Sequence, residues 1–230
     1  MTTRTSSAFT LIELLVVIAI IAVLATLAVP AITNALVKGQ MTGTMNNARQ
    51  LFLAGFQMAT DGAANSDPNY SWPGGDTTVT TLQNYVTKMV RNDYLKAGDL
   101  QKILNAPGTN LQVTAPADEN SEVGLTGKCA LKVYRIGESD PSNTIFVVTA
   151  NYSYNTALTT AAIPYGDKGF VVMRKGGDAS IFRKNQATQA NTRNDLEKFK
   201  NAVGVLTVTT PPATTPPAQE SAAMVLTNPN

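Results

Sequence analysis

The sequence of 230 residues contains no histidine and a single cysteine, Cys129. Without histidine the chain lacks the commonest general base and the commonest metal ligand. Neither Gly74-Gly75 nor Gly176-Gly177 lies in a phosphate-binding pattern, and no nucleophile motif occurs. A single cysteine cannot form an intramolecular disulfide, and its apolar neighbours at 130–133 predict a buried, inert thiol. The composition predicts a protein that is not an enzyme and has no cofactor and no metal.

Charged side chains make up only 15% of the chain, and residues 9–29 hold one of them, Glu13. The run from Leu14 to Val29 is apolar except for Thr26, and Pro30 follows it. A helix over residues 9–29 would rise roughly 32 Å, which is close to the hydrocarbon thickness of a bilayer. The segment can therefore span a membrane, and a carboxylate inside such a helix is expected to be functional.

The residues around Glu13 resemble the start of prepilins, the precursors of type IV pilins and of type II secretion pseudopilins. The shared pattern is a short polar leader and a small residue, followed by Phe-Thr-Leu-Ile-Glu-Leu at 9–14. The resemblance implies that a prepilin peptidase cuts between Ala8 and Phe9 and N-methylates Phe9. It also implies that Glu13 neutralises the new amino terminus of a neighbouring subunit in a filament, as charges in a low dielectric would favour. The family usually has Gly where this chain has Ala8.

Two other interpretations of the apolar run are open. A secretory signal has a charged start, a shorter apolar centre and a small-residue cleavage site, for which Val23-Leu24-Ala25 is the candidate. A plain single-span anchor has the same hydropathy as a pilin. Arg4 favours a cytoplasmic amino terminus in either anchored interpretation. We expect a single-pass inner-membrane protein before assembly, and a cell-surface or periplasmic filament after it.

Helical periodicity continues beyond Pro30. Apolar and small residues recur at spacings of four and three on one face: Met41, Met45, Ala48, Phe52, Gly55 and Ala59. This face predicts that residues 31–60 continue the helix and pack under a globular domain. Pro30 removes one backbone hydrogen bond and predicts a helix kink. Asp61-Gly62 is the predicted end of the helix.

The remaining chain predicts two short helices followed by strands. Apolar spacing over 82–90 predicts one helix, and Asp99 is the predicted cap of the other. Four strands are predicted, at 130–136, 144–151, 169–174 and 179–183. Lys175-Gly176-Gly177-Asp178 predicts a tight hairpin turn. The expected fold is α+β and pilin-like: a long N-terminal helix, membrane-spanning in its first half, packed on a C-terminal antiparallel sheet.

We therefore expect five segments along the chain. They are a prepilin leader (1–8), a transmembrane and filament-core helix (9–30), its continuation (31–60), a globular pilin-like domain (61–206) and a Thr/Pro-rich disordered tail (207–230). The composition of the tail is also compatible with O-glycosylation.

One loop gathers oxygen ligands that could bind calcium, as some pseudopilins do: Asp67, Asn69, Ser71 and Asp76. Its spacing lacks the central Gly and terminal Glu of the helix-loop-helix calcium motif. A solvated turn is the favoured interpretation.

Charges of opposite sign are concentrated in different parts of the chain. Residues 61–125 contain eight acidic and four basic side chains, whereas residues 166–204 contain eight basic and four acidic ones. A solvated face and complementary contact between successive subunits are two interpretations. The third is DNA binding by a basic group around an aromatic side chain, comprising Arg174, Lys175, Phe182, Arg183 and Lys184.

The expected function is that of a structural subunit in a type IV pilus-like filament. Its expected partners are a prepilin peptidase, identical or related pilin subunits, the membrane, and an inner-membrane assembly platform with its ATPase. One alternative is a type II secretion pseudopilin. Another, of a different class, is a membrane-tethered surface binding protein that does not polymerise.

Overall fold

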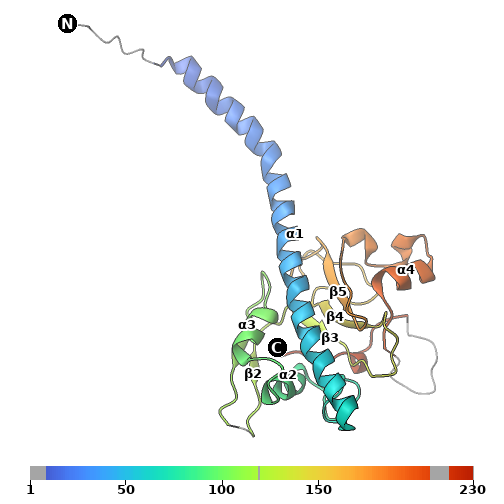
Figure 1. The fold of residues 1–230 in the computed structure, drawn as a ribbon. Coiled ribbons are helices and arrows are strands. Elements are labelled where there is room, and N and C mark those ends of the chain that lie inside the picture. Colours follow the sequence, from blue (N-terminus) through green and yellow to red (C-terminus); the bar gives the residue numbers. More distant parts are fainter. Residues whose placement is uncertain (1–8, 119, 208–217, 230) are drawn as a thin grey trace. The chain divides into compact units, whose positions relative to one another are not determined.

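Helix α1 (Leu11–Asn65) is the longest element of the computed structural model, which describes residues 9–118, 120–207 and 218–229 (Figure 1). The chain divides into two units, Met1–Gly39 and Gln40–Asn230. We call them the N-terminal unit and the globular unit. In the N-terminal unit the described chain is the first half of α1, and the second half of α1 belongs to the globular unit.

The globular unit adds short helices and strands to the second half of α1. Its helices are α2 (Leu82–Arg91), α3 (Ala97–Ile103) and α4 (Leu196–Val203), with 3-10 turns η1 (Lys184–Gln186), η2 (Gln189–Thr192) and η3 (Ala222–Met224). Its strands are β1 (Gln112–Thr114), β2 (Gly124–Thr126), β3 (Leu131–Val133), β4 (Ile145–Thr149), β5 (Phe170–Arg174) and β6 (Ala179–Phe182). The fold is the expected α+β arrangement.

Four of the strands form an antiparallel sheet in the order β3-β4-β5-β6, and β1 pairs with β2 in a separate hairpin. Val147 of β4 pairs with Val133 on one side and with Met173 on the other. Every residue of β4 and β5 is buried, as in central strands covered on both faces. Between β5 and β6, the Arg174 amide donates to the Asp178 carbonyl at 2.9 Å, which confirms the predicted hairpin turn.

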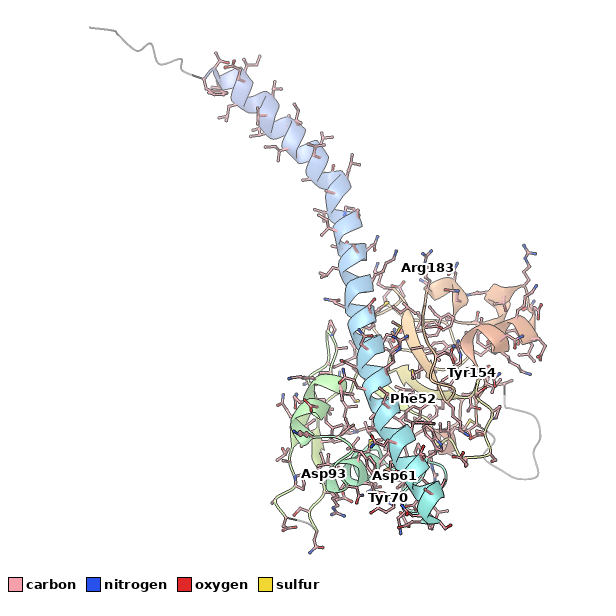
Figure 2. The ribbon with its side chains drawn as sticks, viewed as in Figure 1. Phe52, Asp61, Tyr70, Asp93, Tyr154 and Arg183 are labelled. Atoms are coloured by element: carbon pink, nitrogen blue, oxygen red, sulfur yellow. The ribbon has the colours of Figure 1, made fainter. Side chains whose placement is uncertain are left out.

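The second half of α1 packs on the sheet and on α2 through the predicted face. The ring of Phe52 lies 6.1 Å from that of Phe146 in β4 (Figure 2). A Cβ atom at Gly55 would lie 2.5 Å from the hydroxyl oxygen of Tyr85, so glycine permits the close approach of α1 and α2. All residues of the predicted face are buried except Met45, which is half-buried.

The predicted end of α1 at Asp61-Gly62 is wrong, because the helix continues to Asn65. Ser66 then adopts a left-handed conformation with φ 56°, and the Asp67 amide donates to the Gly62 carbonyl at 2.9 Å. These are the features of a Schellman C-terminal motif. Gly62 is required for another reason, since a Cβ atom there would overlap the carbonyl of Tyr70.

The remaining elements follow the sequence patterns in part. Thr81 caps α2 by accepting a hydrogen bond from the Asn84 amide at 3.0 Å, as expected for a helix over 82–90. The predicted cap at Asp99 is wrong, because α3 begins after Lys96 and Asp99 lies in its first turn. A carboxylate in that turn still interacts favourably with the helix dipole. The strand predictions have the right places but are one to four residues too long, and α4 and the β1–β2 hairpin were not predicted.

The C-terminal segment 218–229 is attached to the outer edge of β3. The Leu226 amide donates to the Val133 carbonyl at 2.9 Å, and the Arg135 amide donates to the Met224 carbonyl at 2.7 Å. Leu226 is fully buried. The segment therefore covers an edge whose backbone groups would otherwise be unpaired.

This attachment corrects the expectation of a disordered tail over 207–230 for the residues 218–229. Thr207 is buried, and its hydroxyl donates to the Asp140 carboxylate at 2.7 Å. The apolar run 224–226 supplies the burial that holds the last residues on the domain. Residues 208–217 of the predicted tail lie outside the described residues.

Glu220 fixes the start of the C-terminal segment. Its carboxylate accepts hydrogen bonds from Lys132 Nζ at 2.7 Å, from the Tyr134 hydroxyl at 2.5 Å and from the Tyr154 amide at 3.2 Å. The side chains of Lys132 and Glu220 are only 12% and 14% exposed. A mostly buried ion pair thus joins β3 to the end of the chain.

Glu220→Gln should lower the free energy of unfolding by about 2 kcal/mol, because Lys132 would remain buried without its counter-ion. Glu197→Gln is the matched control, since Glu197 also pairs with a lysine but its side chain is 75% exposed. We expect the control to change the free energy by less than about 0.5 kcal/mol. Denaturant unfolding of the detergent-solubilised full chain, followed by the fluorescence of Trp72, measures both. Equal effects of the two substitutions would show that Glu220 does not anchor the segment.

Candidate functional site

The start of α1 carries a reciprocal pair of hydrogen-bonding side chains. The amide and the hydroxyl of Thr10 both donate to Glu13 Oε2, at 2.8 and 2.7 Å. The Glu13 amide donates to the Thr10 hydroxyl oxygen at 3.3 Å. This is a capping box, which satisfies amide groups that have no acceptor within the first turn of a helix. It defines a helix that begins at Leu11.

The capping box was not predicted from the sequence, although its signal was present. Thr10 and Glu13 have the Thr-x-x-Glu spacing of a capping box and directly precede an apolar run. From the sequence, Glu13 was expected only to neutralise the amino terminus of a neighbouring subunit, as the prepilin resemblance implies. The structure adds a local role, which is to fix the start of α1.

Phe9, the predicted site of N-methylation, precedes the helix and is 82% exposed. Ala8, the other side of the predicted cleavage site, lies outside the described residues. Cleavage between Ala8 and Phe9 and methylation of Phe9 therefore stay predictions.

The N-terminal unit presents a continuous apolar surface. Every large apolar side chain from Leu11 to Leu36 is exposed, and the least exposed of them, Val17, is 46% exposed. Among the described residues, α1 is the one helix long and apolar enough to cross a membrane, with a mean hydropathy of 2.9 in its most apolar window. Core helices of soluble proteins also pass this test, but no residue of that window is buried. Such a surface requires lipid or another apolar partner.

Helix α1 continues through Pro30 without interruption. Threonine hydroxyls before and after Pro30 donate hydrogen bonds to backbone carbonyls of the helix. The Thr26 hydroxyl donates to the Val23 carbonyl at 2.7 Å, and the Thr33 hydroxyl donates to the Pro30 carbonyl at 3.0 Å. A role for Pro30 as a kink stays a prediction.

Comparison with known families provides the deciding observation for this end of the chain. Residues 3–29 match the model of the prokaryotic N-terminal methylation motif. The chain carries a prepilin-type cleavage and methylation segment. The prepilin resemblance is thereby confirmed for this segment, which includes Thr10 and Glu13, and the motif implies processing by a prepilin peptidase. The motif and its apolar helix indicate inner-membrane anchoring before assembly. Comparisons with curated proteins and with solved structures gave no match.

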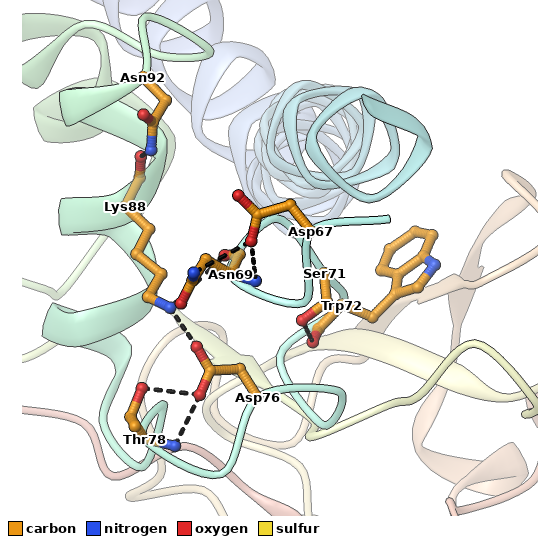
Figure 3. Close-up of polar contacts among 8 residues, drawn as sticks. All are labelled: Asp67, Asn69, Ser71, Trp72, Asp76, Thr78, Lys88 and Asn92. Carbon is orange, nitrogen blue, oxygen red and sulfur yellow. Dashed lines mark hydrogen bonds and ion pairs between the residues drawn. The ribbon is translucent and has the colours of Figure 1, made fainter. Parts of the chain in front are cut away.

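The loop proposed as a calcium site already holds a cation of the protein itself. Lys88 pairs with the Asp76 carboxylate, and its Nζ lies 3.4 Å from the Asn69 carbonyl oxygen (Figure 3). The Asp67 carboxylate accepts hydrogen bonds from the amide and the side chain of Asn69, at 2.9 and 3.0 Å. The Ser71 hydroxyl donates to the Trp72 carbonyl at 3.2 Å. At least one oxygen atom of each of these four residues is thus engaged within the protein.

The basic group considered for DNA binding does not form one exposed patch. Arg174 is only 6% exposed, and its guanidinium lies 5.9 Å from the ring of Phe182, which is also buried. It binds the carbonyls of Ala202 and Val203 at the end of α4. Lys175 binds backbone carbonyls of the loop 138–140. Only Arg183 and Lys184 of the group are exposed. The other members, Arg174, Lys175 and Phe182, are therefore not available to contact DNA.

Cys129 is buried, as predicted, and its thiol lies against backbone carbonyls. Burial raises the pKa of the Cys129 thiol to about 12. The reactive thiolate is therefore scarce at neutral pH.

The Asp76–Lys88 pair should make stability depend on pH. Burial alone would raise the pKa of Asp76, but hydrogen bonds from Lys88 and Thr78 outweigh it and hold that pKa below its usual value. A lowered pKa stabilises the fold above the unfolded-state value near 3.9, and this stabilisation is lost as the pH falls through the folded-state pKa. Asp76→Asn should therefore cost about 1 to 2 kcal/mol at pH 6, and the difference from the native chain should shrink as the pH falls below about 4. Denaturant unfolding at several pH values measures this difference, and a constant difference would contradict the assignment.

The capping box should control the order of the first helical turn. Thr10→Val removes the hydroxyl and should destabilise the helix start by about 1 kcal/mol, whereas Thr10→Ser keeps the hydroxyl. The Glu13 amide donates to the Thr10 hydroxyl and the Leu14 amide to the Thr10 carbonyl. Amide hydrogen exchange of Glu13 and Leu14 in detergent micelles should therefore be about fivefold faster in Thr10→Val and unchanged in Thr10→Ser. Unchanged exchange in Thr10→Val would mean that the cap does not hold the turn.

Proposed function

We propose that this chain is a structural subunit of a type IV pilus-like filament that polymerises through the first half of α1. The observation that carries the proposal is the prepilin-type segment at 3–29, whose helix exposes all its large apolar side chains and places one carboxylate at its start. A prepilin peptidase would cut between Ala8 and Phe9 and methylate Phe9. The apolar surface would be covered by lipid before assembly and by other subunits afterwards.

The geometry of Glu13 supports a role in assembly. Both hydrogen bonds from Thr10 are to Oε2, and among the described residues Oε1 accepts none. Oε1 is thus available for the amino-terminal ammonium of a neighbouring subunit. Inside lipid each of the two charges is unfavourable alone, and their pairing relieves both penalties.

The proposed partners follow from this mechanism. They are the prepilin peptidase, identical or related pilin subunits, the membrane, and an inner-membrane assembly platform with its ATPase. The platform and its ATPase would supply the energy for extracting the helix from lipid.

A second candidate is a type II secretion pseudopilin. It is favoured by the single buried cysteine, because many type IV pilins close their C-terminal region with a cysteine pair. In this chain Glu220 and Lys132 attach the C-terminal segment without a covalent bond.

Two substitutions of Glu13 test the proposal and separate its two roles. Glu13→Gln keeps a side chain that can serve in a capping box but removes the charge, whereas Glu13→Ala removes both. If the charge drives assembly, both variants should remain in the membrane and lose about tenfold or more of the sheared filament, since each uncompensated charge in lipid is costly. Thr10→Ser, which keeps both the capping hydroxyl and the charge of Glu13, is the control and should still assemble.

Filaments sheared from cells and quantified by immunoblot give the readout, and mass spectrometry of their amino terminus tests processing. A methylated Phe9 at the terminus is expected. An intact leader through Ala8 in filaments would overturn the processing step. The native chain could instead form no filament, while both Glu13 variants accumulate in the membrane as the native chain does. That result would support a tethered binding protein.

A further inference from the structure

A surface pocket of about 300 Å³ lies where α1 ends in the globular unit. Its walls combine small residues from the last turns of α1 with aromatic residues of the following loop: Ala59, Gly62, Ala63, Tyr70 and Trp72. Two carboxylate side chains, Asp67 and Glu138, also line it. The pocket is thus apolar and aromatic in its walls and negatively charged.

No cation of the described chain neutralises these two carboxylates. Glu138 is exposed and takes part in no ion pair, and the hydrogen bonds to Asp67 come from Asn69, which is neutral. The nearby carboxylate of Asp76, in contrast, is paired with Lys88. The pocket therefore presents negative charge that has no internal partner in the part of the chain that the structure describes.

The opposite situation occurs around η1 and η2. Most cations there have an acidic partner, as the pairs Lys184–Asp167, Lys198–Asp195 and Lys200–Glu197 show. Arg183 precedes η1 and Arg193 follows η2; both are exposed, and neither forms an ion pair with a described residue. The Asn191 side chain donates to the Lys184 carbonyl at 3.3 Å, which holds the two turns together. Figure 2 shows Arg183 at the opposite end of the globular unit from Tyr70, which lines the pocket.

We propose that the pocket of one subunit binds an arginine of the η1–η2 region of a second copy of this chain. A guanidinium suits this pocket better than an ammonium, because its planar group pairs with carboxylates through two hydrogen bonds and stacks on aromatic rings. Asp67 and Glu138 supply the carboxylates, and Tyr70, which is half-buried, supplies a ring. The donor is Arg183 or Arg193, which are exposed and form no ion pair with a described residue. Arg49 and Arg91 are also exposed and form no ion pair with a described residue, but neither lies in the η1–η2 region.

A second copy is the occupant that charge complementarity favours. One chain carries both an acidic pocket and exposed arginines without an ion pair, and Arg183 lies at the opposite end of the unit from the pocket residue Tyr70 (Figure 2). Successive copies can therefore repeat the contact indefinitely. This inference rests on the proposed function, because it describes a contact between filament subunits. It assigns to the globular unit a contact separate from the one at Glu13.

Charge reversal with rescue tests the contact in the full-length chain. Glu138→Arg places a positive charge in the pocket, where it would repel the incoming arginine. The double variant Arg183→Glu with Arg193→Glu places negative charges on the partner surface, where they would repel the pocket carboxylates. Each should lower the yield of sheared filament by about tenfold, because like charges facing each other strongly disfavour an interface. The triple variant, with all three reversals, should recover most of the native yield. Lys102→Glu, an exposed reversal outside both regions, is the control and should assemble normally.

The outcomes separate this contact from the proposed function. If the native chain forms filaments and Glu13→Gln abolishes them, but all charge reversals assemble normally, the contact is wrong and the proposed function stands. If the native chain forms no filaments, the proposed function itself fails. A third outcome is that Glu138→Arg loses filaments, the double arginine variant assembles normally and the triple variant does not recover. This outcome would show that the pocket binds another cationic ligand and not a second copy of the chain. Immunoblots of membranes verify that every variant accumulates to the native level.

Discussion

Water solvates the outward-facing leucine, isoleucine and valine side chains between Leu11 and Leu36 only at a large cost in free energy, about 25 cal/mol for each Å² of apolar surface. Lipid tails and neighbouring apolar helices both remove this cost. Because the two environments are about equally apolar, the hydrophobic effect gives little preference for a filament over the bilayer. In the proposed filament, the preference would depend on side-chain packing and on polar contacts. Glu13 is the one charged side chain in this segment, and it lies at the end where an amino terminus would form.

The globular unit is held together by polar contacts that replace covalent closure. Arg174 extends from β5 to the last carbonyls of α4, and Glu220 joins the C-terminal segment to β3. Both charged groups are mostly buried and have hydrogen-bonding partners, which is the condition for a buried charge to be tolerated. The positions of α4 and of residues 218–229 are therefore specified by a few directional contacts as well as by apolar packing.

Periodicity and turn chemistry predicted the features that depend on near neighbours in the sequence. The face of α1 from Met41 to Ala59, helix α2 and the hairpin turn at 175–178 are examples. Features that depend on distant residues were missed. Gly62 was interpreted as the end of the helix, but it lies inside the helix. Its lack of a side chain is required because the backbone of Tyr70 passes against it. The run 224–226 looked too short to matter, since the sequence does not show the open edge of β3 that it covers.

The candidate site shows the same division. Its position and the role expected of Glu13 followed from hydropathy and from the prepilin resemblance. The family match at 3–29 confirms the position of the segment, and the role of Glu13 in assembly stays a proposal. The hydrogen bonds with Thr10 depend on local spacing alone and were predictable, whereas the pocket lined by Asp67 and Glu138 joins two loops that are far apart in sequence. The basic group around Phe182 was misleading, because burial of Arg174 cannot be seen from its charge.

The docking of residues 224–228 on β3 affects how copies of the chain meet one another in a membrane. Chains confined to a membrane plane encounter one another far more often than chains free in solution. An uncovered β3 would offer each encounter a row of free backbone amides and carbonyls, and two such edges can join irreversibly. Because residues 224–227 occupy that row, a chain that has completed its fold cannot pair with another copy along this edge.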